Sequence, residues 1–205
     1  MKTLAFELSS GRGSIALAED SEELFHRSFS NDRKDSGAFF ENVRLCLQRF
    51  GAPGEIVVGL GPGSYAGVRI AIATAIGLRT TLAAKLAGVP SICALEVESR
   101  DYCVIGDAKR QSFFFARISD GRLIDRPVLM SAAELETRIQ DGTIPVYASE
   151  LLPQFPLAKL AYPIARKLTE IARPEIGDTG SLEPIYLREP HITVPKNGRT
   201  VAARK

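Results

Sequence analysis

The chain contains no tryptophan and very little histidine or cysteine. Its 205 residues include two histidines, three cysteines and 7% aromatic residues. The histidines, His26 and His191, are far apart in the sequence and form no paired-ligand spacing, which disfavours a zinc hydrolase. The odd number of cysteines without a Cys-x-x-Cys pair argues against a disulfide framework. It indicates buried thiols in a reducing compartment.

A strong excess of charge and a long apolar run are also missing. The formal net charge of +2 is too small to indicate nucleic-acid binding by itself. The longest run of low charge carries Arg69 and Arg79 and is rich in Gly, Ala and Thr, so a membrane span is not expected. The first residues lead directly into an apolar strand pattern rather than a secretory signal. We therefore expect a cytoplasmic globular protein that does not contact a membrane.

What is present is an α/β pattern in the first half of the chain. Three short alternating runs predict a meander of strands, and an amphipathic helix should cover Gly37–Phe50. A buried strand at Glu55–Leu60 leads through a glycine-rich turn into a long helix over Val68–Ala87. A further strand is predicted at Val89–Leu95.

The second half echoes the first. The segments TLAFELSSGRGSIALAED and YCVIGDAKRQSFFFARISDG both read as apolar strand, acidic strand end, polar turn, apolar strand and acidic turn. This similarity predicts an internal duplication of a hairpin-led α/β unit. A helix at Ser131–Gln140, which starts with capping-box spacing, should be followed by a strand at Pro145–Ala148 and a helix near Leu157–Arg173.

The glycine-rich turn carries Gly61, Gly63 and Gly67. It lacks the Lys of a phosphate-binding P-loop, because Val68 and Arg69 follow the last glycine, and its third glycine is one residue late for a dinucleotide fingerprint. A helix N-terminus attracts anions in general, so a phosphate site stays an alternative. We favour a tight strand-to-helix turn whose glycines permit close packing.

The long helix has two nearly uncharged faces. One consists of Val68, Ile72, Ile76 and Leu86, and the other of Ile70, Thr74, Gly77, Leu78 and Thr81. Such a helix is either buried inside its own domain or shared between its sheet and a partner protein.

Acid–base and nucleic-acid chemistry have weaker support. Glu7 and Asp107 occupy similar places in the two halves, so they could hold Mg²⁺ in a phosphotransferase cleft, although ordinary strand-end carboxylates are the favoured interpretation. The basic stretch Arg188–Lys205 fits a solvated tail better than a contact with an RNA backbone. No Ser–His–Asp relay is apparent.

Several of these segments together resemble the TsaB (YeaZ) family. The specific one is GPGSYAGVRI at Gly61–Ile70, which is similar to the family form GPGSFTGVRIG. The opening strand pair, the helix and strand GLRTTLAAKLAGVPSICALE, the hairpin VIGDAKRQSFFFARI and the closing LEPIYLRE add softer similarity. The chain departs from the family at Glu7, where an Asp is usual, and at Asp35-Ser36-Gly37, where His-Ser-Glu is common.

The resemblance implies an actin/hexokinase-like fold of two ribonuclease-H-like halves, the second one reduced. The expected division is 1–98 and 99–190, followed by a basic tail at 191–205. It also implies a non-catalytic subunit in the synthesis of threonylcarbamoyladenosine in tRNA. Catalysis would belong to a TsaD-like subunit, with a TsaE-like ATPase in the assembled complex. No catalytic, cofactor-binding or metal-binding residue is then expected in this chain.

In that family the partner contact is made by the two helices of the first half, which also allow a homodimer, while contact with tRNA is indirect or weak. Carried over to this sequence, the interface residues are Phe39, Phe40, Val43, Ile70, Thr74, Gly77, Leu78 and Thr81. Two alternatives stay open: a divergent ATPase or sugar-kinase-like phosphotransferase that uses Glu7 and Asp107, and a metallopeptidase.

Overall fold

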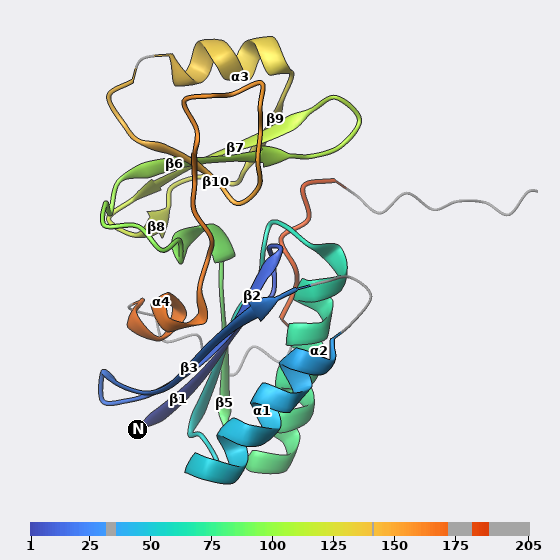
Figure 1. Cartoon of the computed structure of the whole chain (residues 1–205), viewed down its shortest axis with the longest axis vertical. Coiled ribbons are helices and arrows are strands. Elements are labelled where there is room, and N and C mark those ends of the chain that lie inside the picture. The colour runs from blue at the N-terminus through green and yellow to red at the C-terminus, as the bar shows by residue number, and fades with distance from the viewer. Residues whose placement is uncertain (32–35, 141, 172–181, 189–205) are drawn as a thin grey trace, which may run out of the picture.

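Two β-sheets, one in each half of the chain, form the framework of the protein (Figure 1). The computed structural model describes residues 1–31, 36–140, 142–171 and 182–188. In Figure 1 the sheet of the first half lies below the sheet of the second half, with helices α1 and α2 on one side of the lower sheet and α4 on the other.

The first sheet has the strand order β3-β2-β1-β4-β5. The strands β1, β2 and β3 form the antiparallel meander that the alternating runs predict, and β4 and β5 add to β1 in parallel. A parallel strand needs a crossover connection, and α1 and α2 supply the two crossovers. In chain order the elements are β1 (Lys2–Glu7), β2 (Arg12–Glu19), β3 (Glu22–Ser30), α1 (Gly37–Phe50), β4 (Glu55–Gly59), α2 (Tyr65–Leu82) and β5 (Lys85–Val89).

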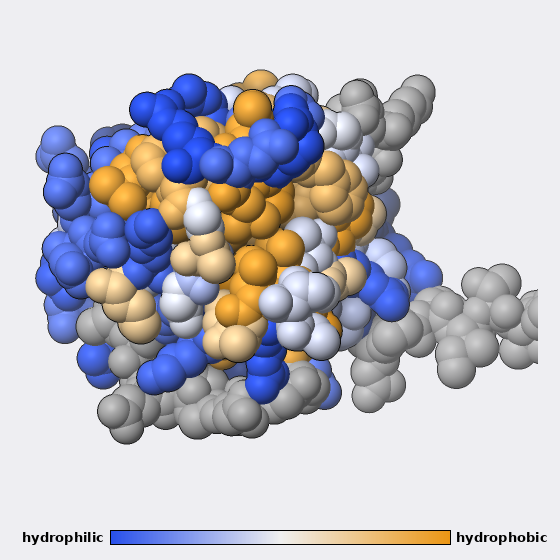
Figure 2. Space-filling view, turned by 90° about the horizontal axis from the view of Figure 1, so that it is seen from below, coloured by the Kyte–Doolittle hydropathy of each residue, from blue (hydrophilic) through white to orange (hydrophobic). Residues whose placement is uncertain are grey.

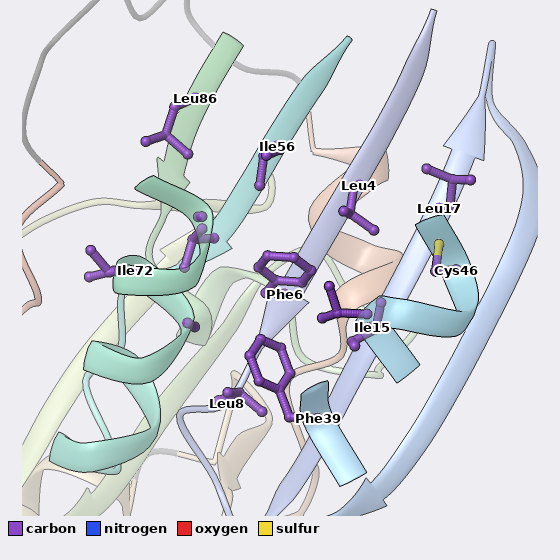
Figure 3. Packing of buried hydrophobic residues seen from close by; sticks show 14 of the residues in the cluster. Leu4, Phe6, Leu8, Ile15, Leu17, Phe39, Cys46, Ile56, Ile72 and Leu86 are labelled. Carbon is purple, nitrogen blue, oxygen red and sulfur yellow. The ribbon is translucent and has the colours of Figure 1, made fainter. Parts of the chain in front are cut away.

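The strands β1, β2 and β4 of this sheet are buried on both faces, whereas the edge strand β3 is largely exposed. On β1, Leu4 and Phe6 point into the core under α1 and α2, whereas Ala5 between them joins the core on the opposite face. Figure 3 shows Leu4, Phe6 and Ile15 projecting toward the helices, with Phe39 of α1 packed edge-on against Phe6 at a ring-centroid distance of 5.2 Å. Alternate residues of a strand face opposite sides, so large side chains fill the helical side and alanines make room on the other.

Helix α1 has the bounds that the sequence predicts, but α2 does not. Helix α2 starts at Tyr65, where the Ser64 side chain accepts a hydrogen bond from the Gly67 backbone N–H, and it ends before Ala83, which is left-handed at φ 52°. Lys85–Val89 then forms β5, and a short 3-10 helix occupies Ser91–Cys93. The predicted helix to Ala87 and the predicted strand at Val89–Leu95 are therefore wrong.

The second sheet repeats the topology of the first in a smaller form. Its order is β11-β10-β6-β7-β8, with β9 also paired to β7. As in the first sheet, a central strand, β6, has an antiparallel hairpin partner on one side and parallel strands on the other. Its elements are β6 (Tyr102–Asp107), β7 (Phe113–Ser119), β8 (Arg122–Leu123), β9 (Val128–Met130), α3 (Ala132–Ile139), β10 (Val146–Ala148) and β11 (Lys159–Leu160).

This repeat confirms the predicted duplication and the α/β fold of two ribonuclease-H-like halves. The second half is reduced, because no helix lies between β10 and β11 where α2 lies between β4 and β5. Helix α3 begins with the predicted capping box: Ser131 Oγ accepts from the Glu134 N–H, and Glu134 Oε2 accepts from the Ser131 N–H at 2.7 Å.

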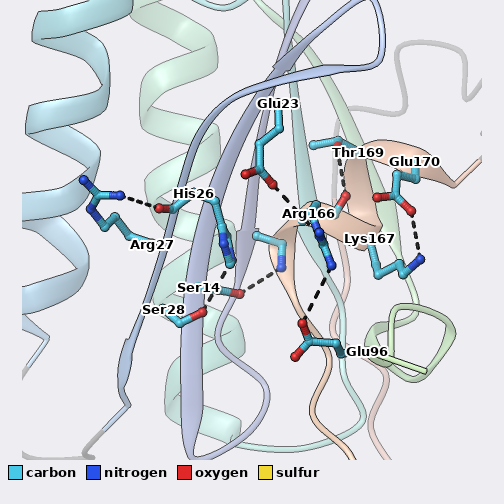
Figure 4. Close-up of polar contacts among 11 residues, drawn as sticks. Ser14, Glu23, His26, Arg27, Ser28, Glu96, Arg166, Lys167, Thr169 and Glu170 are labelled. Atoms are coloured by element: carbon cyan, nitrogen blue, oxygen red, sulfur yellow. Dashed lines mark hydrogen bonds and ion pairs between the residues drawn. The ribbon is translucent and has the colours of Figure 1, made fainter. Parts of the chain in front are cut away.

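After β11 the chain returns to the first sheet. Helix α4 (Ala165–Glu170) packs on β1 and β2, where the Ala165 N–H donates to Ser14 Oγ at 2.8 Å. Figure 4 shows this contact together with Arg166, which reaches Glu23 of β3 and Glu96. The helix is much shorter than the predicted Leu157–Arg173. The predicted boundary at residue 98 thus assigns α4 to the second half, although α4 packs on the sheet of the first half.

Among the residues described, no helix is both long enough and apolar enough to cross a membrane.

Candidate functional site

The outer surface of α1 and α2 is the contact face that the sequence predicts. Both helices cover the same side of the first sheet (Figure 1). Each has apolar side chains on its outer surface as well as in the core. Phe40 and Leu45 of α1 and Ile76 of α2 are 48%, 42% and 42% exposed. We call the following exposed or half-exposed residues the α1–α2 face: Phe40, Leu45, Ile70, Ala73, Thr74, Ile76, Gly77, Leu78, Thr80 and Thr81.

Seen from below, where α1 and α2 end, the molecule shows an apolar area in its middle (Figure 2). Hydrophilic side chains are gathered along its upper edge in that view and to one side of it. A central apolar area with a polar rim is the usual anatomy of a protein–protein contact.

Phe39 and Val43 are a correction to the predicted interface. Both side chains lie in the core, at 1% and 6% exposure, because positions 39, 43 and 46 of α1 share the face that packs on the sheet. The other six predicted residues lie on the α1–α2 face, with Gly77 and Thr81 fully on the surface. The prediction missed Leu45 and assigned Ile76 to the buried stripe, although helical phase places Ile76 beside Gly77 and one turn after Ala73.

Gly77 is the distinctive residue of this face. It sits in the interior of α2, and apart from its chain neighbours and the adjacent backbone of its own helix, an added Cβ atom there would meet no described atom within 4 Å. Glycine in a helix interior costs about 1 kcal/mol relative to alanine. No internal contact of the described chain explains why position 77 is glycine. The absence of a side chain there leaves space for the backbone of another protein.

The glycines of the turn between β4 and α2, in contrast, are required by internal packing. A Cβ atom on Gly63 would overlap the backbone oxygen of Ser9, and one on Gly67 would overlap that of Leu8. Gly61 adopts a positive φ of 85°. The Ser64 N–H donates to the Ser9 carbonyl at 2.6 Å, which ties the turn to the β1–β2 connection. The geometry agrees with a tight strand-to-helix turn rather than a phosphate cradle.

A cleft of about 500 Å³ separates the two halves beside this turn. Polar residues from both halves line it, among them Ser9, Asn31, Ser64, Asp107, Lys109 and Arg188.

The two acids of the phosphotransferase alternative do not meet in this cleft. Glu7 is fully buried and does not line it, and its Oε1 accepts a hydrogen bond from the Ser9 N–H at 2.6 Å. Burial raises the pKa of Glu7, and hydrogen bonds from Ser9 and Ser91 oppose that effect in part. Asp107 does line the cleft, where its hydrogen bond with Lys109 lowers its pKa.

The part of the chain that the structure describes also brings together no group of three or more His, Cys, Asp or Glu side chains that could hold a metal ion. Among the described residues there is therefore no donor set of the kind that holds the zinc or iron of a metallopeptidase.

The fold has clear relatives among solved structures. A protein from Pseudomonas aeruginosa, described as uncharacterised with similarity to the peptidase YeaZ, superposes with a TM-score of 0.73 over 91% of this chain and 99% of that chain, at 23% identity. YeaZ from Pseudomonas aeruginosa superposes with a TM-score of 0.64 over 83% of this chain and 90% of that one, at 22% identity. The chain is YeaZ-like in its fold.

Besides the YeaZ-like fold, the sequence itself is similar to a further family and to several proteins. Residues 49–139, which include α2, match the family described as TsaD, tRNA N6-adenosine threonylcarbamoyltransferase. An uncharacterised protein of Mycobacterium leprae is 31% identical over 138 residues, which are 66% of this chain and 38% of that protein. One from Mycobacterium tuberculosis is 33% identical over 82 residues, 40% of this chain and 39% of that protein. This YeaZ-like chain thus spans about two fifths of the curated relatives that it matches.

Proposed function

We propose that the chain is a non-catalytic subunit of the machinery that makes threonylcarbamoyladenosine in tRNA. In this proposal it docks through the α1–α2 face on a TsaD-like catalytic subunit. The match of residues 49–139 to the TsaD family and the YeaZ-like fold support the biological context. A TsaE-like ATPase joins the assembled complex, and a homodimer through the same face competes with docking.

The exposed glycine at position 77 is the observation that carries the docking proposal. The residues around Gly77 on the α1–α2 face are small, namely Ala73, Thr80 and Thr81. A stripe without large side chains lets a partner helix approach at the short end of the usual interaxial distance of about 8–10 Å. Phe40, Leu45 and Ile76 then supply apolar area beside the contact.

The arrangement of the two acids disfavours a phosphotransferase site built from Glu7 and Asp107. An Mg²⁺-dependent phosphotransferase uses carboxylates that converge on the metal-bound phosphates. Here Glu7 lies in the core under Gly59, and Asp107 is held by Lys109. The proposed division of labour places the transfer reaction on the TsaD-like partner.

Co-purification with the TsaD-like subunit of the same cell tests the docking proposal. Gly77→Arg places a long charged side chain on the α1–α2 face, and we expect it to abolish both co-purification and restoration of the tRNA modification in cells. Ala133→Arg is the matched control, because Ala133 is an exposed small residue of α3 in the other half. It should leave both readouts unchanged. If Gly77→Arg still co-purifies and restores the modification, the docking face is wrongly assigned.

A further inference from the structure

Two tyrosines stand together on the surface where α2 begins. Tyr65 is 57% exposed and Tyr186 is 45% exposed, and their ring centroids lie 5.8 Å apart at an interplanar angle of 38°. The guanidinium of Arg69 lies 5.0 Å from the centre of the Tyr65 ring and donates a hydrogen bond to the Tyr65 hydroxyl. Solvent-facing aromatic rings next to a cation form a ready surface for stacking.

A basic hairpin loop lies on the other side of the cleft mouth. Lys109, Arg110 and Gln111, between β6 and β7, all have positive φ, at 64°, 54° and 58°. Three consecutive non-glycine residues in this region cost energy, and the loop is held by the Ala108 N–H to Ser112 carbonyl bond of 2.9 Å. The strained conformation displays the exposed side chains of Lys109 and Arg110.

The segment 182–188 connects the two sides. Its Ile185 N–H donates to the Leu60 carbonyl at 2.8 Å, next to Tyr186. At its end, the Arg188 guanidinium donates to the Ser112 hydroxyl and to the Lys109 carbonyl. Three elements that are distant in the sequence thus meet at one mouth of the cleft. We call the following residues the cleft rim: Tyr65, Lys109, Tyr186 and Arg188, which line the cleft, together with Arg69, which packs on Tyr65, and Arg110, which follows Lys109.

Positive charge exceeds negative charge on the cleft rim. Four cations, Arg69, Lys109, Arg110 and Arg188, lie there with three nearby acids, Asp107, Glu150 and Glu183. Asp107 pairs with Lys109 at 2.7 Å, whereas Glu150 accepts only the Asp107 backbone N–H, at 2.8 Å, and keeps its charge. Glu183 is the further exposed acid of the segment 182–188. The sequence after Arg188 continues the basic character with Lys196, Arg199, Arg204 and Lys205 against Glu189.

We propose that the cleft rim binds unpaired nucleotides of RNA. Base faces stack on Tyr65 and Tyr186, and the guanidinium groups of Arg69 and Arg188 contact the phosphates. Cations alone would fit any polyanion, but two partly exposed tyrosine rings beside them fit bases that are not paired. The choice of tRNA as the RNA rests on the proposed function, whereas the preference for unpaired nucleotides rests on the rim alone.

Fluorescence anisotropy of a labelled anticodon stem-loop, titrated with the full chain, tests this proposal. A fully paired RNA hairpin of the same length is the reference ligand. We expect the looped RNA to bind at least several-fold more tightly than the paired hairpin. Tyr65→Ala and Tyr186→Ala should each raise the Kd for the looped RNA about tenfold, within the range of one lost base–aromatic stack. Tyr65→Phe keeps the ring and should retain binding.

The salt dependence of binding separates the roles of the arginines. Arg69→Gln and Arg188→Gln should each reduce the slope of log K against log salt concentration by about 0.7, the value for one phosphate contact to a single strand. Arg126→Gln is the matched control. It removes an exposed arginine in the connection between β8 and β9, outside the residues that line the cleft, and should leave the slope unchanged.

Three results would overturn the proposal. The first is equal binding of looped RNA, paired hairpin and polyglutamate, which would indicate a general polyanion surface. The second is unchanged RNA binding in the tyrosine variants. The third is loss of co-purification with the TsaD-like subunit in Tyr186→Ala, which would place the rim in a protein interface. If Tyr186→Ala loses RNA binding but still co-purifies with the TsaD-like subunit, the result supports RNA binding by the cleft rim and does not affect the docking proposal.

Discussion

Replacing Gly77 by alanine should stabilise the isolated chain, although glycine is the residue present. The position lies in the interior of α2, and a Cβ atom there meets no described atom within 4 Å beyond its chain neighbours and the adjacent helix backbone. Alanine is favoured over glycine in a helix interior by about 0.8–1.0 kcal/mol. The Thr81 hydroxyl bond to the Gly77 carbonyl, at 3.2 Å, uses only the backbone of residue 77 and is kept. We therefore expect the free energy of unfolding to rise by about 1 kcal/mol.

For a chain of this size, 1 kcal/mol corresponds to a rise in Tm of about 2–4 °C. Thermal unfolding followed by circular dichroism at several protein concentrations measures the shift and shows whether it depends on self-association. Gly67→Ala is the matched control, since it is the same substitution in the same helix. Its Cβ would overlap the backbone oxygen of Leu8, so its Tm should fall.

Gly77→Ala should change stability and docking in opposite directions. The variant should be more stable alone and, because the added methyl group lies on the α1–α2 face, weaker in its affinity for the TsaD-like subunit. A lower Tm for Gly77→Ala at every concentration would refute the claim that the space beside Gly77 is open in the isolated chain. Equal or tighter binding to the TsaD-like subunit would refute the claim that glycine serves close approach.

Three further predictions follow from burial. Phe39→Ala should lower the free energy of unfolding by about 3–5 kcal/mol, because Phe39 is buried against Phe6. Phe40→Ala should lower it by less than about 1 kcal/mol but weaken docking. Urea unfolding measures the first effect, and co-purification with the TsaD-like subunit measures the second. The pKa of Glu7 is raised above 4.5 in the folded chain, so stability falls as the pH rises from that value to the folded-state pKa. Between pH 4.5 and the folded-state pKa, the free energy of unfolding of Glu7→Gln should therefore rise relative to that of the parent by about 1.4 kcal/mol per pH unit. If the difference in Tm between the two proteins does not change with pH, Glu7 is not a buried ionisable group. Burial raises the pKa of Cys46 to about 11, so iodoacetamide at pH 8 should label it far more slowly in the folded chain than in urea, and equal labelling rates would contradict its place in the core.

Local patterns in the sequence determined the elements whose signals act over one or two turns. The bounds of α1 and the capping box of α3 follow from helical periodicity and from the spacing of Ser131 and Glu134. The repeated order of strand, acid, turn and strand was sufficient to predict two related halves, because each half must bury the same kind of hairpin-led sheet.

Tertiary pairing decided what the local patterns left undetermined. The run from Ala83 to Ala87 suits a helix, yet residues 85–89 become β5 because pairing with β4 satisfies their backbone along a buried sheet. The neighbours Phe39 and Phe40 differ only in helical phase, and the position of the sheet makes one core and the other surface. The cleft rim joins residues more than a hundred positions apart. Its tyrosines and cations come together only because the segment 182–188 folds back onto Leu60, directly after β4. No local sequence signal encodes this long-range contact.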